Sequence, residues 1–206
     1  MNINLQNIGR RFNQEWIFKG IDYTFSSSKS YAILGPNGSG KSTLIKVLSG
    51  QLTPSEGSLT YTSESSDIAV EDIYKQVSIA APYIELIEEF TLNELLDFHF
   101  KFKTPLPNFN TKHIVELLEM QKAANKSLKF FSSGMKQRVK LALACCSDSK
   151  ILFLDEPTSN LDLEGEKWYL NLVKSTSFTG RLLIIGSNQE KEYSFCDEKF
   201  SITSYK

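Results

Sequence analysis

The first 25 residues alternate apolar and polar side chains in two stretches, as in strands with only one buried face. The apolar positions of these stretches are Ile3, Leu5, Ile21, Tyr23 and Phe25. A period of two places successive side chains on opposite faces of a sheet, which is typical of half-buried antiparallel strands. Strand-like pieces return between Gly57 and Ala81, separated by a Ser-rich stretch at 63–67 that predicts a surface turn. We therefore expect a β lobe made of residues 1–30 and 57–81.

Three short apolar runs without alternation predict strands that are buried on both faces. They are YAIL at 31–34, ILFL at 151–154 and LLII at 182–185. Segments with helical spacing alternate with these runs, beginning with LIKVLSG after the first one. This alternation implies a mainly parallel core sheet flanked by helices, so we predict an α/β fold. Ligands of such sheets bind at the carboxyl ends of the strands, where Gly35 and Asp155 lie.

A helical lobe is expected in the middle of the chain. Apolar spacings of three and four run from about Thr91 to Met120 and are interrupted by the breaker PLP at 105–107. We place this inserted lobe at about 84–133, before a helix that opens at Ser132 or Ser133. The remaining residues belong to the core sheet and its helices, and residues 1–206 are expected to form a single domain.

The charge balance and the cysteines narrow the possible partners. Lys and Arg total 23 against 24 for Asp and Glu, a formal net charge of -1, so nucleic acid is not an expected partner. Cys145, Cys146 and Cys196 fit neither a disulfide framework nor CxxC metal spacing, and we expect them to be reduced. No stretch resembles a signal peptide or approaches the ~20 apolar residues of a membrane span. We therefore expect a soluble, cytoplasmic chain.

A Gly-rich loop follows the first buried run and precedes a helix. Its sequence is GPNGSGKST, formed by Gly35, Pro36, Asn37, Gly38, Ser39, Gly40, Lys41, Ser42 and Thr43. The pattern GxxxxGK[ST] lets successive backbone N–H groups turn inward and bind phosphate oxygens at a helix N-terminus. Lys41 is expected to neutralise the β- and γ-phosphates of ATP, and Ser42 to bind Mg²⁺. We therefore predict that this loop binds ATP.

A pair of acids ends the second buried run, in the sequence ILFLDE. In NTPases a strand ends in a carboxylate that holds Mg²⁺ through water, and Asp155 is placed for that role. Glu156 then stands where it could polarise an attacking water. Taken alone, the two acids are also explained by a strand that meets solvent, but their pairing with the phosphate loop favours the metal site.

Three segments in this order, GPNGSGKST, SSGMKQR and LDEPTSNLD, resemble those of the ATP-binding cassette (ABC) ATPases. The resemblance covers essentially the whole chain. It implies a P-loop NTPase fold with an antiparallel β lobe and an inserted helical lobe. It also implies a dimer of cassettes, either a homodimer or a heterodimer, that closes around two ATP molecules.

The same resemblance assigns the segment that opens the later helix. Ser132, Gly134 and Met135 correspond to the signature LSGGQ, which contacts the γ-phosphate held by the other subunit. Physically this is again a helix N-terminus that offers N–H groups and a hydroxyl to an anion. Phe131, Ser133 and Met135 replace the Leu, the first Gly and the Gln of the family pattern, whereas Ser132 and Gly134 match it. The signature is therefore expected to be usable but altered.

Two further positions come from the resemblance. Residues 159–162 correspond to the D-loop at the dimer interface, so Asp162 is expected at the nucleotide site. Phe12 is expected to stack on adenine, with Trp16 as the alternative.

Two positions depart from the family pattern. Pro82 stands where the family carries a Gln, no Gln occurs from Val77 to Met120, and Pro82 offers only a carbonyl. Asn188 stands where the family carries a His near the γ-phosphate, and it can donate a hydrogen bond but carries no charge. The two histidines, His99 and His113, lie in the helical lobe and cannot replace it. We expect normal binding of MgATP and slow hydrolysis, with Glu156 and Asn188 as the catalytic residues.

The leading functional hypothesis is the ATP-binding subunit of an ABC transporter. It would work with a separate multi-span permease and lie peripherally on the inner face of the cell membrane. An ABC protein that acts as an ATP-dependent switch outside transport is the alternative. A small-molecule kinase is disfavoured because SSGMKQR and SNLD have no role there.

Overall fold

The computed structural model describes residues 1–63 and 66–206, and these residues form two compact units. The sheet unit comprises Met1–Ile79, Ser149–Glu156 and Phe178–Lys206. The helical unit comprises Ala80–Asp148 and Pro157–Ser177. Each unit is described by itself.

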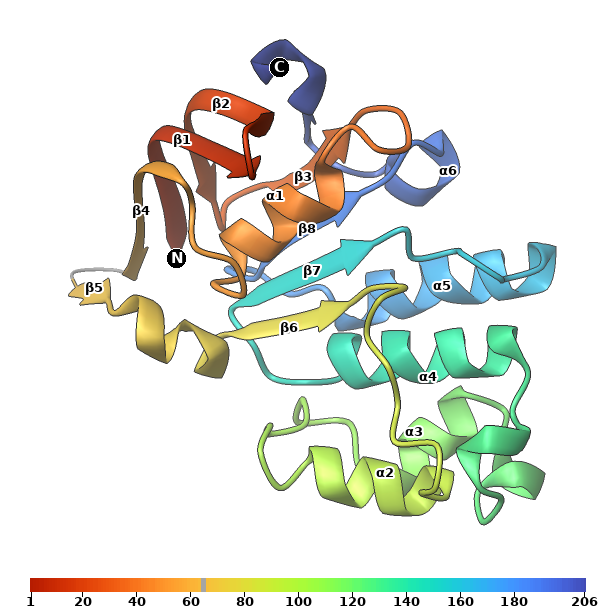
Figure 1. Ribbon diagram of the computed structural model, residues 1–206. Coiled ribbons are helices and arrows are strands. Elements are labelled where there is room, and N and C mark those ends of the chain that lie inside the picture. The colour runs from red at the N-terminus through yellow and green to blue at the C-terminus, as the bar shows by residue number, and fades with distance from the viewer. Residues whose placement is uncertain (64–65) are drawn as a thin grey trace. The chain divides into compact units, whose positions relative to one another are not determined.

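The first layer of the sheet unit is a four-stranded antiparallel sheet in the order β2-β1-β4-β5 (Figure 1). Its strands are β1 (Asn2–Phe12), β2 (Glu15–Ser26), β4 (Glu56–Ser63) and β5 (Ser66–Ile68). Ile3 is paired with Phe25 on one side and with Tyr61 on the other, and all three are buried. The alternation therefore predicted these strands correctly. Of the expected turn at 63–67, Ser66 and Asp67 instead pair in β5, and 64–65 lie outside the described residues.

The second sheet has five strands in the order β6-β7-β8-β3-β9. They are β3 (Ser30–Leu34), β6 (Val77–Ala80), β7 (Ile151–Asp155), β8 (Leu182–Gly186) and β9 (Glu198–Ser201). β8 pairs in parallel with β7 and β3, and β3 pairs in parallel with β9. Every residue of β7 and β8 is buried, as expected for uninterrupted apolar runs in a parallel sheet. The predicted α/β fold with a mainly parallel core sheet is confirmed.

Helix α1 (Lys41–Leu48) follows β3 and packs against β7 and β8. Its buried face carries Leu44, Ile45 and Leu48, at the spacing of three and four that one helix face requires. Tyr61 of the antiparallel sheet donates its buried hydroxyl to the Leu48 carbonyl over 3.1 Å. This contact ties the C-terminal end of α1 to β4 within the same unit.

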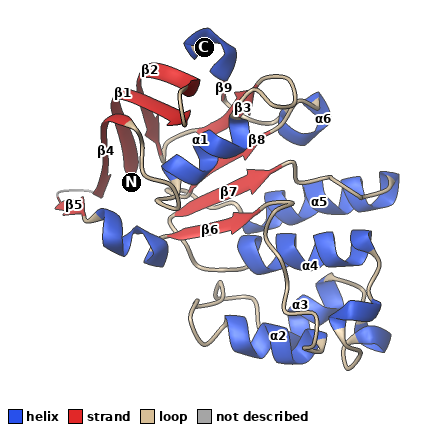
Figure 2. Cartoon of the chain, in the orientation of Figure 1, coloured by secondary structure: helices blue, strands red, loops and turns tan. Residues whose placement is uncertain are grey.

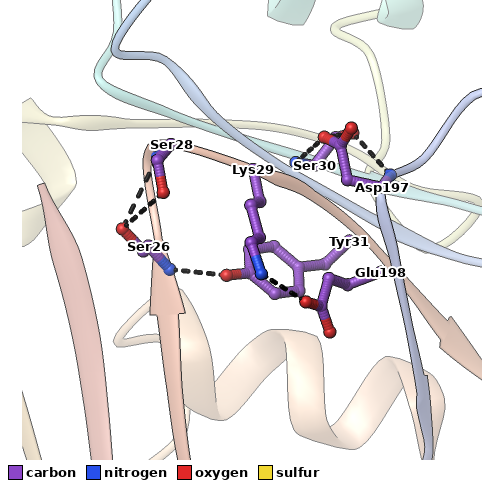
Figure 3. A network of polar contacts seen from close by, with 7 residues as sticks. All are labelled: Ser26, Ser28, Lys29, Ser30, Tyr31, Asp197 and Glu198. Atoms are coloured by element: carbon purple, nitrogen blue, oxygen red, sulfur yellow. Dashed lines mark hydrogen bonds and ion pairs between the residues drawn. The ribbon is translucent and has the colours of Figure 1, made fainter.

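A polar network joins the starts of β3 and β9 (Figure 3). The Ser30 backbone N–H and hydroxyl both donate to Asp197 Oδ2 over 2.7 Å, and Lys29 Nζ lies 2.5 Å from Glu198 Oε1. The Tyr31 hydroxyl accepts a hydrogen bond from the Ser26 backbone N–H over 3.0 Å. These contacts set the register of β9, which lies about 170 residues from β3 along the chain.

The helical unit consists almost wholly of helices and loops (Figure 2). Its main helices are α2 (Leu92–His99), α3 (Thr111–Leu117), α4 (Ser133–Cys145) and α5 (Leu163–Thr176). Each begins after a residue that accepts a backbone N–H bond with its side chain: Thr91, Asn110, Ser132 and Asp162. α4 and α5 pack against each other. The expected lobe at 84–133 lies inside this unit, and its definition as a separate lobe stays a prediction.

No described helix has the length and apolar character needed to cross a membrane. Cys145 and Cys146 are buried in α4 and at its end, and neither they nor Cys196 is disulfide-bonded in the described chain.

The buried imidazole of His99 predicts a pH-dependent stability. Burial lowers the pKa of His99 to about 4, and its Nε2 lies 2.9 Å from the Ser147 hydroxyl. An unfolded His titrates near pH ~6.5, so below that pH the unfolded chain binds the additional proton. We expect this residue to lower the free energy of unfolding as pH falls from ~6.5 to ~4, measured by urea denaturation across that range.

The matched comparison is His99→Gln, which should show a weaker pH dependence than the wild type over this interval. His113→Gln, at an exposed position on α3, should keep the wild-type dependence. Identical pH dependence in the wild type and His99→Gln would contradict the assignment.

Candidate functional site

The loop between β3 and α1 folds around the side chain of its own lysine. Lys41 is buried, and its Nζ donates to the carbonyl of Gly35 over 2.8 Å and to that of Pro36 over 3.2 Å. The Ser39 backbone N–H donates to the Pro36 carbonyl over 3.1 Å. The first N–H groups of α1 have no acceptor within the helix, so a cation and several donors are gathered at one point. This arrangement suits an anion.

Two glycines allow the loop to take this shape. Gly40 has φ 105°, in the left-handed region, and a Cβ there would lie 2.6 Å from Ile17 Cγ2. A Cβ on Gly35 would lie 2.4 Å from the Ser39 hydroxyl oxygen. That hydroxyl is buried and has no hydrogen-bond partner in the part of the chain that is described. A buried donor without a partner is costly, and a bound ligand that accepts a hydrogen bond from this hydroxyl would remove that cost.

Asp155 ends β7 with a fully buried carboxylate. Neither of its oxygens has a hydrogen-bond partner among the described residues. Burial raises the pKa of Asp155 to about 6, and the Ser42 hydroxyl and the Lys41 ammonium oppose that shift. The Ser42 hydroxyl is thus close to the carboxylate without forming a bond of good geometry.

This pair of side chains fits Mg²⁺. Two orphaned carboxylate oxygens beside a hydroxyl are the hard oxygen ligands that this ion takes, and it usually keeps several waters and substrate phosphates as its other ligands. No cluster of three His, Cys, Asp or Glu residues suited to a metal occurs among residues 1–63 and 66–206. Ser42 and Asp155 would fill part of the coordination shell of this ion, and phosphate oxygens and water would supply the rest.

Glu156 follows Asp155 in a strained backbone conformation. Its φ is 45°, in a region that costs a residue with a side chain about 1 kcal/mol or more, and its N–H donates to the Gly186 carbonyl over 2.8 Å. The hydrogen bond to β8 holds the strained residue in place. Strain of this kind clusters at functional sites, and here it redirects the chain immediately after Asp155.

Asn188 lies in the loop after β8 and contacts the phosphate loop. Its Nδ2 donates to Asn37 Oδ1 over 2.9 Å, and both side chains are exposed. The structure thus brings together residues from the carboxyl ends of β3, β7 and β8, as the sequence predicted for a parallel sheet.

The two candidate adenine-stacking residues differ in how they are covered. Phe12 ends β1 with 47% of its surface exposed, and the Arg10 guanidinium lies 4.6 Å from the centre of its ring. Trp16 packs over Gly9, where a Cβ would lie 2.8 Å from the indole, and Lys19 covers its ring at 5.0 Å. The geometry therefore favours Phe12 over Trp16 as the accessible ring.

The signature and D-loop residues meet in the helical unit. Ser132 caps α4 by accepting the Met135 N–H over 3.2 Å, and Asp162 caps α5 by accepting the Gly165 N–H over 2.8 Å. A Cβ on Gly134 would lie 3.0 Å from the Asn160 carbonyl oxygen. A hollow of about 380 Å³ lies at these two helix starts. Its lining includes Ser132, Gly134, Met135, Arg138, Asn160 and Asp162.

A family model for ABC transporters matches residues 18–159. The chain belongs to the ABC transporter family. It is 28% identical over 199 residues to the Nod factor export ATP-binding protein I of Burkholderia lata, covering 95% of this chain and 66% of the relative. It is 30% identical over 191 residues to the lantibiotic transport ATP-binding protein SrtF of Streptococcus pyogenes, covering 90% of this chain and 80% of the relative. The chain spans 66% and 65% of the length of two of its curated relatives.

Solved ABC cassettes have the same fold. An ABC transporter ATP-binding protein from Pyrococcus furiosus superimposes with a TM-score of 0.81 at 21% identity, over 100% of this chain and 99% of that chain. A dimeric bacterial ABC transporter cassette gives a TM-score of 0.80 at 21% identity, over 97% and 94% of the two chains. At this identity the likeness establishes the P-loop NTPase fold of the ABC ATPases.

Pro82, the first departure from the family pattern, is exposed, and its carbonyl accepts a hydrogen bond from Lys140 Nζ over 3.2 Å. Burial lowers the pKa of Lys140, and the charge of Glu85 acts in the opposite direction. The one polar atom that Pro82 offers is therefore already in a bond within the helical unit.

Three residues, one in the sheet unit and two in the helical unit, were not singled out in the sequence analysis. A Cβ on Gly186 would lie 2.8 Å from Asp155 Oδ1, so only Gly fits beside that carboxylate. Gln137 is buried and donates to the Pro157 carbonyl over 2.8 Å, directly after the two acids. The Arg138 guanidinium lies 4.6 Å from the Trp168 ring centre and lines the hollow. The sequence signals available for these residues were weak. Gly186 ends an apolar run, and Gln137 and Arg138 are polar residues that follow the helix cap Ser132.

The buried carboxylate predicts a measurable titration. In the nucleotide-free protein we expect Asp155 to titrate near pH 6, because burial destabilises its charged form. Ser42→Ala removes a group that lowers this pKa and should raise it further. Carbon-13 NMR of the aspartate carboxyl groups measures both values.

Asp197 is the internal control, since its hydrogen bonds from Ser30 lower its pKa below the usual value. An Asp155 carboxyl that titrates at or below pH ~4, like an unperturbed aspartate, would contradict the assignment.

Proposed function

We propose that this chain is the ATP-binding subunit of an ABC transporter, and that it binds and hydrolyses MgATP to drive substrate movement through separate membrane subunits. The observation that carries the proposal is the phosphate loop, which curls around buried Lys41 at the sheet edge where neither oxygen of Asp155 has a hydrogen-bond partner among the described residues. Family membership supports the nucleotide, and relatives named as export and transport ATP-binding proteins support the transport role.

In this proposal the loop from Gly35 to Thr43 binds the phosphates. Lys41 leaves the two carbonyls that it now contacts and pairs with the β- and γ-phosphates, while the loop N–H groups and the Ser39 hydroxyl donate to phosphate oxygens. Phe12 stacks on adenine with the ring face that Arg10 leaves open.

Ser42 and Asp155 hold Mg²⁺ in the proposed site. When bound, the ion would supply positive charge that offsets the negative charge of the phosphates. Ser42 would supply a hydroxyl oxygen to the ion, and Asp155, in its deprotonated form, would help to hold it. Glu156, held by its bond to the Gly186 carbonyl, accepts a proton from the attacking water.

Asn188 is the second proposed catalytic residue. Its amide already donates to Asn37 on the phosphate loop, so it can donate to a γ-phosphate oxygen after a small rotation. An amide lacks the charge that a protonated imidazole supplies, so we expect slow hydrolysis by the chain alone.

The proposed partners are a second cassette and a multi-span permease. Ser132, Gly134, Met135 and Asp162 would complete the ATP site of the other cassette, in a homodimer or a heterodimer, and a solved cassette of the same fold is a dimer. The permease would hold the chain on the inner face of the cell membrane. Nucleic acid is not a proposed partner, because the formal net charge of the chain is -1. The relatives' transport names favour this role over a switch outside transport.

The test combines ATP binding, phosphate release and partner capture. The wild type should bind MgATP, Lys41→Ala should lose at least about 10-fold in affinity because a buried charge contact is removed, and Glu156→Gln should bind ATP but release no phosphate. Calorimetry and a phosphate assay measure these outcomes. Protein isolated from its native membrane should carry a multi-span permease.

Glu116→Gln, exposed on α3, is the matched acid-to-amide control and should match the wild type in both assays. A wild-type chain that binds no ATP would refute the nucleotide site, and a membrane preparation without a permease would favour the switch.

The departure at Asn188 predicts a gain of function. Asn188→His should raise the steady-state ATPase rate, because the imidazole adds a charged donor where one such donor is often worth about 10²-fold in rate. Asn188→Ala should lower the rate below that of the wild type. Unchanged turnover in Asn188→His, or wild-type turnover near the ordinary enzyme median of about 10 s⁻¹, would contradict slow hydrolysis caused by Asn188.

A further inference from the structure

Glu192 is a buried acid that the proposed reaction does not use. It lies in the short helix α6 (Glu190–Tyr193) of the sheet unit, with 1% of its surface exposed. A carboxylate is buried at this level only when hydrogen bonds or charges compensate for its lost hydration. Its Oε2 accepts a hydrogen bond from the hydroxyl of Ser187, which is itself fully buried at the end of β8.

Ser187, Gln189 and Glu192 form a local hydrogen-bond network on both sides of Asn188 in the sequence. The Ser187 hydroxyl accepts the Gln189 backbone N–H over 2.9 Å, and the Glu192 N–H donates to the Gln189 carbonyl over 3.0 Å. The Ser187 N–H donates to the Ile33 carbonyl of β3 over 3.2 Å. The residues on both sides of Asn188 are thus fixed, while Asn188 itself is exposed with its amide on Asn37 of the phosphate loop.

The carboxylate sets the direction of the Ser187 hydroxyl. That hydroxyl has one proton, and when Glu192 accepts it, the oxygen lone pairs face the Gln189 N–H. Without Glu192 the proton turns to another acceptor, such as the Gln189 carbonyl at 3.4 Å. A glutamine at position 192 still offers a carbonyl oxygen, so it can preserve the bond that alanine removes.

Lys199 of β9 contacts two residues of the helix that carries Glu192. Lys199 of β9 lies 3.7 Å from Glu190 and 5.6 Å from the centre of the Tyr193 ring. β9 pairs with β3, the strand that leads into the phosphate loop. Lys199, which contacts α6, therefore lies on β9, and the phosphate loop that Asn188 contacts follows the neighbouring strand β3.

We propose that Glu192 is a positioning residue that acts through Ser187 to hold the Asn188 amide against the phosphate loop. Its effect on hydrolysis rests on the function proposed above, whereas its effect on the Asn188 side chain does not. Glu192 touches neither the nucleotide nor the reacting atoms in this assignment. Its loss should change the rate of the chemical step and leave nucleotide affinity nearly intact, because misplacing one group at a site by about 1 Å can cost up to about 10²-fold in rate.

The first readout is structural and needs no ATP. The two side-chain amide protons of Asn188 are assigned in the nitrogen-15 NMR spectrum by their absence in Asn188→Asp. In the wild type we expect them to be shifted from the free-amide position by the bond to Asn37. Glu192→Ala and Ser187→Ala should move them to that position, and Glu192→Gln should keep them in place.

The second readout is kinetic and uses the whole chain with MgATP. Glu192→Ala should lower the single-turnover rate roughly 10-fold with the dissociation constant of ATP changed by less than about 2-fold. In an Asn188→Ala background the same substitution should have no further effect, since its route of action is gone. Tyr61→Phe, which loses a buried hydroxyl bond at the C-terminal end of α1, is the control for general destabilisation and should leave the Asn188 resonances unchanged.

The outcomes separate the two proposals. Asn188 resonances that stay unshifted in folded Glu192→Ala and Ser187→Ala, or an equal rate loss with and without Asn188, would overturn the positioning role. If Glu192→Ala does not fold, Ser187→Ala and Glu192→Gln decide by the same criteria. A wild type that binds no ATP but shows the predicted resonance changes would refute the proposed function and support the positioning role.

Discussion

The parallel pairing of β8 with both β7 and β3 is the constraint on which the site depends. It places Ile33, Gly186 and Asp155 in one row of the sheet, so three loops leave from the same edge. The strands are buried, and their backbone groups must be paired with one another because water cannot reach them. A shift of one residue in β8 would move Gly186 away from Asp155 and place a side chain against the carboxylate. The environment of the functional side chains at this edge thus depends on the backbone register of β8.

Within that edge, the nucleotide-free protein satisfies some charges and leaves others unsatisfied. Lys41 is held by two loop carbonyls, which compensate the buried ammonium, whereas Asp155 is buried without a hydrogen bond from a described residue. The pKa of Asp155 is raised because burial favours the neutral acid and no hydrogen bond from a described residue stabilises the carboxylate. A divalent cation would reverse that preference, and its binding is therefore linked to release of a proton near pH 6. The Ser39 hydroxyl and the Asp155 carboxylate have no hydrogen-bond partner among the described residues, and the proposed ligand would satisfy both.

Much of this arrangement could be predicted from local pattern, and the rest could not for identifiable reasons. Uninterrupted apolar runs predicted β3, β7 and β8, and the Gly-rich loop predicted the phosphate site, because both signals lie within a few consecutive residues. β9 escaped prediction since only Phe200 of its four residues is buried, and the strand exists through pairing with distant β3. Glu192 stands in the charged stretch EKEY, which by pattern is a solvated turn. Its burial and its bond to Ser187 arise only when α6 folds back on the sheet.

The altered position at Asn188 changes the way in which the site can be controlled. An imidazole near the γ-phosphate would change charge with pH and would respond to a neighbouring carboxylate, whereas an amide stays neutral at every pH. The contribution of the Asn188 amide depends on its orientation alone. That orientation is set here by the hydrogen-bond network of Ser187, Gln189 and Glu192. A weaker donor requires more exact placement for the same effect, because the stabilisation that it offers depends on hydrogen-bond geometry without the longer reach of a charge. The hydrogen-bond network that orients Asn188 therefore compensates for the charge that its amide lacks.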